Sequence, residues 1–360
     1  MSRTTIRSVT VEPLNIPLLE PFTIATGTTT EARNVLITIT LEDGSVGYGE
    51  STPFSPSTGE TQETALAAAR GCAELLKSKD AAHWRILSKL LRGVFFSQMT
   101  AIAGIEMALL DALTRSYGIP LYVFFGGAAT AVETDISIPL VTPEHAYDLA
   151  KAIVARGITT IKIKVGGDIR EDVARVEAVR EAAPGIGLML DANQGYTASE
   201  ALLCLEALDD HGIRPLLMEQ PVHKDDYEGL RYVTQHTPVP VAADESAYSA
   251  ANAAHLIAMG AINVVNIKLM KSGFVEALDI AAVCRATHTQ LMIGAMMESR
   301  LAISAAAHFV AGLGGFRFVD LDTPMLLAED PFTGGYVQKG GVYDLSEVDR
   351  GLGIERKITV

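Results

Sequence analysis

Apolar and charged residues alternate along residues 160–166, Thr-Ile-Lys-Ile-Lys-Val-Gly, and this pattern predicts a short buried strand. Successive side chains of a strand point to opposite faces, so Lys162 and Lys164 share one face and the isoleucines occupy the other. If helices cover the isoleucine face, the two lysines point into the interior of a barrel. There each ammonium group lowers the pKa of the other, which would make one lysine a usable base near neutral pH. The alternative interpretation of this segment alone is an edge strand with two solvated lysines.

Four more apolar segments downstream each end in a charged residue, and their spacing is regular. From Lys164 the chain reaches Asp191 after 27 residues, Glu219 after 28 more, Asp244 after 25 and Lys268 after 24. One strand, one helix and two loops of a βα unit take roughly that many residues. The five side chains are therefore expected at the same end of successive strands, where the active site of a (β/α) barrel lies.

The remaining patterns predict an α/β fold with two domains. Residues 1–128 are predicted to form an α+β domain. It should contain a three-stranded meander (5–18, 34–41, 45–50) and helices at 60–78, 81–92 and 98–117. Residues 129–328 are predicted to form the barrel. Its first strand is expected at 134–139, with Ser137 at the end of the strand that faces the active site. Its last two strands are expected at 291–298 and 318–322. Residues 329–360 are rich in glycine and are expected to return to the first domain.

The helix predicted near residues 101–113 is apolar on most sides and should be buried. Glu106 and Asp111 interrupt this apolar surface. We expect them to be structural partners for buried polar groups and not catalysts.

Composition narrows the class of protein. The chain has 360 residues, 48% of them hydrophobic and 20% charged, which is ordinary for an enzyme that buries a sizeable core. The net charge of −14 argues against nucleic acid and anionic membranes as partners. The three cysteines fit neither a disulfide framework nor a zinc site, and the chain shows no signal peptide and no long apolar stretch. A cytoplasmic enzyme is expected, and a homo-oligomer stays open.

The three carboxylates Asp191, Glu219 and Asp244 would repel one another strongly if they faced each other unpaired. A divalent cation resolves this repulsion, and an all-oxygen set suits Mg²⁺, with Mn²⁺ as the alternative. Asn193 and Glu245 are placed to support these ligands. The competing interpretation is that each carboxylate caps the helix that follows it.

The strand order also places Lys164 and Lys268 across the barrel from each other, with the metal between them. A substrate carboxylate on that metal would have one base on each face of its α-carbon. Such an arrangement suits removal of a proton from one face and its return on the other.

These motifs together resemble the enolase superfamily, in its muconate-lactonizing-like subgroup, and most of all the dipeptide epimerases typified by L-Ala-D/L-Glu epimerase. The resemblance rests on Lys-x-Lys, Asp-x-Asn, Glu-Gln-Pro, Asp-Glu and Asn-Ile-Lys-Leu-Met-Lys, and it covers nearly the whole chain. It implies a modified TIM barrel of (β/α)7β type with an N-terminal α+β capping domain completed by the C-terminal segment. It also implies Mg²⁺-dependent 1,1-proton transfer through an ene-diolate, which inverts the α-carbon of the C-terminal residue of a dipeptide.

The resemblance assigns roles to individual residues. Lys164 and Lys268 are the expected acid/base pair, and Lys162 is the electrostatic neighbour of Lys164. The pair Asp320 and Asp322 resembles the Asp-x-Asp that holds the α-ammonium of the substrate. The expected metal ligands are Asp191, Glu219 and Asp244.

Substrate choice is expected to depend on two loops of the capping domain, 19–32 and 51–60. Epimerases that prefer a C-terminal glutamate place a cation in the first loop, but this loop has no Lys or Arg, and Gly27 stands where that cation would align. A preference for neutral, hydrophobic dipeptides is therefore expected. The remaining substrate-contacting residues predicted around this pocket are Ile24, Phe54, Ser137, Met296, Met297 and Glu298.

Other functions remain possible interpretations of the sequence. The chain could act as an L-Ala-D/L-Glu epimerase, or as an N-acylamino acid racemase or cycloisomerase on the same scaffold. A different class is a non-catalytic binding protein that has kept the barrel, which the loss of a metal ligand or lysine would have supported.

Overall fold

The first domain is built on a three-stranded antiparallel sheet of β1 (Ile6–Ile24), β2 (Gly27–Leu41) and β3 (Val46–Ser51). The computed structural model describes residues 2–357, so the ends of the predicted segments 1–128 and 329–360 that fall on residues 1 and 358–360 lie outside the described residues. Many buried residues of the sheet and of the helices form one apolar cluster, while others, such as Leu36 and Met107, belong to the large cluster that also contains the barrel residues. The helices of this domain are α1 (Ser55–Thr58), α2 (Gln62–Leu76), α3 (Trp84–Val94), α4 (Met99–Tyr117) and α5 (Leu121–Phe124), with a 3₁₀ turn η1 (Ala81–His83).

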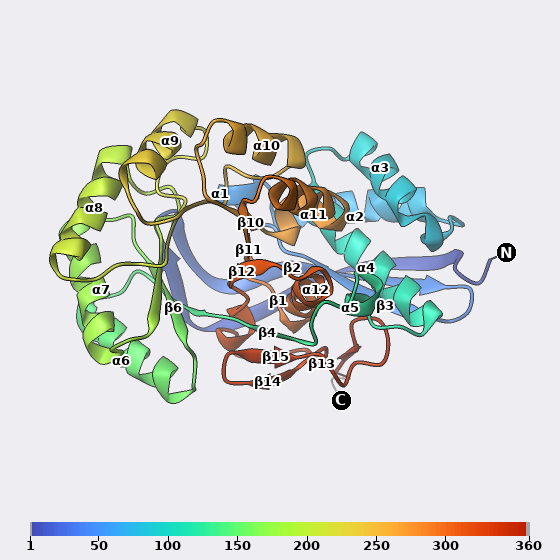
Figure 1. Ribbon diagram of the computed structural model, residues 1–360. Helices are drawn as coiled ribbons and strands as arrows, with labels where there is room; N and C mark the ends of the chain where they lie inside the picture. The colour runs from blue at the N-terminus through green and yellow to red at the C-terminus, as the bar shows by residue number, and fades with distance from the viewer. Residues whose placement is uncertain (1, 358–360) are drawn as a thin grey trace.

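The segment 19–32, which the sequence suggested as a loop, is the tip of a long β-hairpin. β1 continues to Ile24 and β2 begins at Gly27, so only two residues separate the strands. The pairing register shifts between Pro17 and Phe22, where the prolines of this segment cannot donate a ladder hydrogen bond. The threonines that made the segment look irregular are β-branched and suit the strand. The hairpin extends from the first domain toward the barrel (Figure 1).

The second domain is a parallel barrel, as predicted. Its sheet has the order β12-β11-β10-β9-β8-β7-β6-β5, and the backbone N–H of Asp135 donates to the carbonyl of Val319 at 3.0 Å, which brings the two end strands together. The strands are β5 (Ile136–Ile138), β6 (Thr160–Lys164), β7 (Gly187–Asp191), β8 (Leu217–Glu219), β9 (Val241–Ala243), β10 (Val264–Ile267), β11 (Gln290–Ile293) and β12 (Phe316–Val319).

One helix follows each of the first seven strands and covers the outside of the barrel (Figure 1). Isoleucines 161 and 163 belong to the large apolar cluster between strands and helices, so the helix-facing side predicted for them is confirmed. The helices are α6 (Pro143–Ala155), α7 (Ile169–Ala182), α8 (Ala198–Asp210), α9 (Tyr227–His236), α10 (Ala250–Ala258), α11 (Leu269–Ala286) and α12 (Arg300–Leu313).

The C-terminal segment joins both domains. A 3₁₀ turn η2 (Thr323–Met325) leads into β13 (Phe332–Gly334), β14 (Val337–Lys339), β15 (Val342–Asp344) and β16 (Ile354–Arg356). β15 pairs with β14 and with β4 (Ala131–Glu133), while single bridges join Leu18 to Leu327 and Pro120 to Gly351. The expected fold class, a modified barrel with a capping domain and a returning C-terminal segment, is confirmed.

The two acidic residues of the buried helix α4 have the structural roles predicted for them. Glu106 accepts hydrogen bonds from the backbone N–H groups of Phe274 (2.6 Å) and Val275 (3.1 Å), just after α11 kinks at Gly273. Asp111 accepts from the backbone N–H of Leu352 at 2.7 Å and thereby holds the C-terminal segment. Across residues 2–357, the helices are too short or too polar to span a bilayer.

Candidate active site

The interior of the barrel consists of an apolar layer with a polar layer above it. Six inward-facing residues form a buried apolar cluster: Met189, Leu217, Ala242, Val264, Met292 and Phe318. Because strand side chains alternate with period two, the residue two positions later points inward again, one layer closer to the carboxyl end. On five of these six strands that residue is polar: Asp191, Glu219, Asp244, Asn266 and Asp320. The alternation of residues along the strands therefore places a polar layer at the carboxyl end of the barrel.

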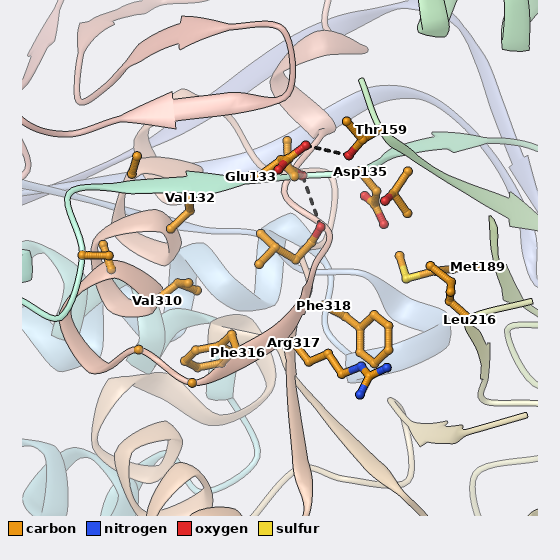
Figure 2. A pocket seen from close by; sticks show the side chains of 18 residues that line it. Val132, Glu133, Asp135, Thr159, Met189, Leu216, Val310, Phe316, Arg317 and Phe318 are labelled. Carbon is orange, nitrogen blue, oxygen red and sulfur yellow. Dashed lines mark hydrogen bonds between the residues drawn. The ribbon is translucent and has the colours of Figure 1, made fainter. Parts of the chain in front are cut away.

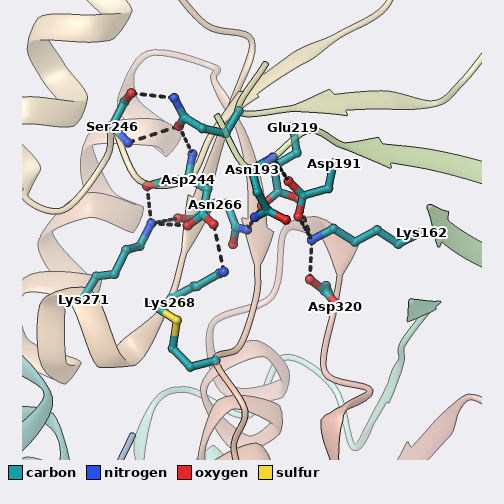
Figure 3. A network of polar contacts seen from close by, with 12 residues as sticks. Lys162, Asp191, Asn193, Glu219, Asp244, Ser246, Asn266, Lys268, Lys271 and Asp320 are labelled. Carbon is teal, nitrogen blue, oxygen red and sulfur yellow. Dashed lines mark hydrogen bonds and ion pairs between the residues drawn. The ribbon is translucent and has the colours of Figure 1, made fainter. Parts of the chain in front are cut away.

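Lys162 connects three of the carboxylates. Its ammonium nitrogen lies 2.6 Å from Asp320 Oδ2, 2.8 Å from Glu219 Oε2 and 3.0 Å from Asp191 Oδ2. The side chain is 1% exposed and enters from one side of the network, opposite Lys268 and Lys271 (Figure 3). Lys162 therefore compensates buried negative charge beneath the site.

The two expected acid/base residues stand on opposite sides of the barrel. Lys164 Nζ lies 2.6 Å from Asp191 Oδ2, and Lys268 Nζ lies 2.8 Å from Asp244 Oδ2. In the strand order, β6 and β10 are separated by three strands in either direction around the barrel. The two ammonium groups thus face the centre from opposite walls.

Carboxylates and not the neighbouring lysine dominate the charge environment of Lys162. Burial lowers the pKa of Lys162. The charges of Asp191 and Asp320 raise it by more than burial lowers it, so the pKa lies well above its usual value. The expected mutual lowering of the lysine pKa values is therefore not what governs Lys162. For Lys268, burial likewise lowers the pKa, but the charges of Asp244, Glu219 and Glu245 together raise it above its usual value.

The three expected metal ligands lie side by side. Asp191 pairs in register with Lys164 on one side and with Glu219 on the other, and Asp244 follows the neighbouring strand β9. All three are buried. Burial raises the pKa of Glu219 to about 7, together with the charge of Asp191, whereas Lys162 and Lys164 overcome burial and lower the pKa of Asp191.

These residues fit a hard divalent cation. Asn193 Oδ1 and Glu245 Oε2 are buried without a hydrogen-bond donor, and oxygens of this kind suit Mg²⁺. Within residues 2–357, a tighter acidic group also exists: Asp135, Asp320 and Asp322 each place one oxygen within 4.8 Å of the others. The donor set of Asp191, Glu219 and Asp244 is the one that adjoins both Lys164 and Lys268.

Three residues that had no predicted role position the ligands. Lys271 Nζ lies 2.6 Å from Asp244 Oδ1, and Asn266 donates to Glu219 Oε1 at 2.7 Å. Gln220 Oε1 accepts the backbone N–H of Asp244 at 2.9 Å. Asn266 and Lys271 belong to the Asn-Ile-Lys-Leu-Met-Lys motif and Gln220 to Glu-Gln-Pro, so the motifs contained a signal for all three.

A cavity of about 490 Å³ opens above this layer, between the hairpin tip, the loop after β3 and the barrel. It is lined by Lys164 and Lys268 together with Asn193. The lining also includes eight of the residues predicted to contact the substrate: Ile24, Gly27, Phe54, Ser137, Met296, Met297, Asp320 and Asp322.

Two residues predicted to contact substrate lie elsewhere. Lys162 sits among the carboxylates beneath the cavity, and the Glu298 carboxylate turns back to accept the backbone N–H of Met296 at 2.8 Å. Burial raises the pKa of Glu298 to about 8. Neither side chain lines the cavity in the part of the chain that the structure describes.

Asp320 and Asp322 approach each other without lying on a strand. β12 ends at Val319, because the chain turns into η2 at Thr323, so the predicted strand 318–322 is too long. Asp320 binds Lys162, and Asp322 Oδ2 accepts the backbone N–H of Ser137 at 2.6 Å. Similarly, β11 ends at Ile293, and Met296 and Met297 lie on the loop beyond it.

A cation in the cavity wall was also missed. Arg33 lies one residue beyond the predicted specificity loop and lines the cavity. Its guanidinium lies 2.8 Å from Glu63 Oε1, and Glu63 lines the same cavity. The signal in the sequence was a basic residue directly before the predicted second strand, 34–41.

Comparisons with known proteins agree with this architecture. Residues 6–126 match the mandelate racemase / muconate lactonizing enzyme N-terminal domain, and residues 130–358 match the enolase C-terminal domain-like family. The chain is 44% identical to an aromatic dipeptide epimerase of Herpetosiphon aurantiacus, over 96% of this chain and 97% of that protein. It is 38% identical to an L-Ala-D/L-Glu epimerase of Thermotoga maritima, over 89% and 93% of the two chains.

A solved structure is also closely similar. The dipeptide epimerase of Enterococcus faecalis, in complex with Mg and the dipeptide L-Leu-L-Tyr, has a TM-score of 0.94 at 36% identity, covering 98% of this chain and all of that one. The chain therefore belongs to the mandelate racemase/muconate lactonizing enzyme family of the enolase superfamily. Within that family it belongs with the dipeptide epimerases, and the expected enzyme class, an isomerase, is confirmed.

Proposed function

We propose that this chain is a Mg²⁺-dependent dipeptide epimerase that inverts the α-carbon of the C-terminal residue with two lysine bases. The observation that supports this most is that Lys164 and Lys268 line one cavity from opposite walls, with three buried carboxylates between them. Lysines on opposite walls are what removal of a proton from one face of a carbon and its return on the other face require.

Asp191, Glu219 and Asp244 would hold the Mg²⁺, with Asn193 and Glu245 beside them. When bound, the ion supplies Lewis-acid stabilisation of the negative charge that develops on the substrate carboxylate. Lys271, Asn266 and Gln220 keep the ligands in place, and Lys162 carries part of the remaining charge balance.

The proton transfer follows from the placement of the lysines. One lysine takes the α-proton as an amine and becomes an ammonium group, while the opposite lysine donates its proton to the other face of the same carbon. The configuration of that carbon is inverted, and the two lysines have exchanged protonation states. Positioned acid/base groups contribute on the order of 10²–10⁴-fold to such a step.

Asp320 and Asp322 would bind the α-ammonium of the N-terminal residue. Both carboxylates are buried and line the cavity, next to Ser137. A free ammonium is what separates dipeptides from the substrates of N-acylamino acid racemases and cycloisomerases. This acidic pair therefore favours dipeptides over those alternatives.

We further propose that neutral, hydrophobic C-terminal residues are preferred. Phe22, Ile24, Phe54, Met296 and Met297 give the cavity an apolar wall. Arg33 is the feature that favours the second candidate, a C-terminal glutamate, because it is a cation in the same wall. Glu63 already pairs with that cation and neutralises it.

The test is a direct assay of epimerisation. Purified enzyme with Mg²⁺ is incubated separately with L-Ala-L-Phe, L-Ala-L-Leu and L-Ala-L-Glu, and the L,D products are resolved by chiral chromatography. The proposal expects higher kcat/KM for the phenylalanine and leucine dipeptides. A much higher value for L-Ala-L-Glu would overturn the specificity, and no L,D product from any dipeptide would overturn the reaction.

A further inference from the structure

Asp135 lies behind the active site and takes no part in the proposed metal binding or proton transfer. It lines a second cavity of about 490 Å³ at the amino-terminal end of the barrel, near Met189 and Phe318 (Figure 2). Asp320 and Asp322 line the substrate cavity at the other end. One oxygen of each of the three carboxylates lies within 4.8 Å of the others, so Asp135 backs the pair that faces the substrate.

The surroundings of Asp135 differ from those of its two neighbours. Asp320 has the ammonium of Lys162 at 2.6 Å, and Asp322 has the backbone N–H of Ser137 at 2.6 Å. Asp135 is 2% exposed, and neither of its carboxylate oxygens receives a hydrogen bond. A buried carboxylate that is ionised and lacks donors is costly, and two further carboxylates add repulsion.

We propose that Asp135 is the protonated member of this group and acts as a positioning residue, whose neutral carboxyl donates a hydrogen bond to Asp320 and keeps Asp320 and Asp322 ionised toward the substrate ammonium. This inference rests on the proposed function, because it deepens the recognition of the dipeptide. Burial and then the charges of Asp320 and Asp322 raise the pKa of Asp135 well above its usual value, and the charge of Lys162 opposes them only in part. The adjacent cavity lies on the side away from the substrate, so the proton on Asp135 has no role in the inversion itself.

The experiment compares two variants on two substrates. L-Ala-L-Phe carries the ammonium, and N-propionyl-L-phenylalanine is the same molecule without it. In wild-type enzyme the ratio of kcat/KM between them measures recognition of the ammonium. Asp135→Leu removes the donor while filling similar space, and this ratio should fall by about tenfold or more, mainly through KM for L-Ala-L-Phe. Asp135→Asn keeps a neutral donor, and it should restore the ratio to within about threefold of wild type.

The contrary outcomes are equally distinct. An Asp135→Asn ratio as low as that of Asp135→Leu would show that Asp135 acts as an anion, and the inference would fail. Unchanged ratios in both variants would show a purely structural residue and would also overturn it. As a readout independent of activity, the infrared difference spectrum of wild type minus Asp135→Asn at neutral pH should contain the carbonyl band of a protonated carboxylic acid, and its absence would contradict the proposal. If wild-type enzyme itself does not discriminate the two substrates, the proposed function fails and not the protonation of Asp135.

Discussion

Lys162 and Asp320 lie 158 residues apart in the chain, yet their side chains meet at 2.6 Å inside the barrel. The same ammonium group contacts Asp191 and Glu219, so one lysine joins the expected metal ligands to the expected ammonium site. The balance of charge in the two halves of the site is therefore coupled.

Replacement of Lys162 by methionine should destabilise the metal-free protein strongly. The change leaves Asp191, Glu219 and Asp320 buried without their shared cation, and breaking a buried ion pair costs about 3–5 kcal/mol. Guanidinium unfolding without Mg²⁺ measures the loss. Lys77→Met is the matched control, since Lys77 is an exposed lysine paired with Glu74 at 2.5 Å and should change the free energy of unfolding by less than about 1 kcal/mol. Equal stability of Lys162→Met and wild type would show that the network is not held by this lysine.

Mg²⁺ should raise the melting temperature, and the effect should depend on one group of carboxylates and not on the other. A ligand at 100 times its Kd adds about 2.7 kcal/mol to the stability of the state that binds it. Glu219→Gln should remove the Mg²⁺-dependent shift, because Glu219 lies between Asp191 and Asp244 in the strand order and is the central one of the three expected ligands. Asp322→Asn is the control from the second acidic group and should retain the shift. The reverse pattern would place the metal at Asp135, Asp320 and Asp322.

Specificity should respond to the pair of Arg33 and Glu63. Glu63→Gln leaves Arg33 in the cavity wall without its neutralising partner, so a glutamate side chain of the substrate gains an unpaired cation. Because the pair is exposed, the effect is modest, and kcat/KM for L-Ala-L-Glu should rise about two- to fivefold relative to L-Ala-L-Leu. Arg33→Gln in the same background should reverse the gain. A glutamate activity that stays unchanged in Glu63→Gln would show that Arg33 does not reach the substrate.

Acid stability should depend on His308. Burial lowers the pKa of His308 to about 3 from its usual value of 6.5, and its Nδ1 accepts the backbone N–H of Tyr122 at 3.0 Å. The folded state holds the ring neutral, whereas the unfolded state takes up a proton below pH 6.5. Stability from this group is therefore complete above that pH and falls as pH decreases toward 3, by about 1.4 kcal/mol per pH unit.

His308→Asn offers an amide oxygen in place of Nδ1 and does not titrate. Urea unfolding at a series of pH values should show a shallower decline below about pH 6 in this variant. His223→Asn, at an exposed histidine, should keep the wild-type slope. Identical slopes for His308→Asn and wild type would mean that His308 is protonated in the folded protein.

The sequence allowed the barrel and the ring of charged residues to be predicted because both depend on local periodicity. Period two puts Asp191 above Met189 and Glu219 above Leu217, and the βα spacing brings these residues to one end of the sheet. The lengths of short segments were less predictable. The hairpin tip at Ile24 was mistaken for a loop because prolines and threonines make a strand look irregular, and β12 was predicted to extend beyond Val319.

Side-chain partners across the fold were beyond reach of the sequence. Arg33 meets Glu63 only because α2 packs beside the hairpin, and Asp135 meets Asp320 only because the barrel closes between β5 and β12. Both contacts join residues far apart in the chain, with no spacing that signals them. Lys271 is intermediate, since it stands in a recognised motif but its contact with Asp244 required the structure.

The most direct measurement of the central claim is exchange of the α-proton with D₂O. Wild-type enzyme with Mg²⁺ should place deuterium at the α-carbon of the C-terminal residue of both L-Ala-L-Phe and L-Ala-D-Phe, read as a gain of one mass unit. Lys164→Ala and Lys268→Ala should each abolish epimerisation, and each should still exchange only the epimer whose α-proton faces the remaining lysine. Lys89→Ala, at an exposed lysine of α3, should behave as wild type. Full epimerisation by either active-site variant, or loss of exchange from the same epimer in both, would contradict two opposed lysine bases.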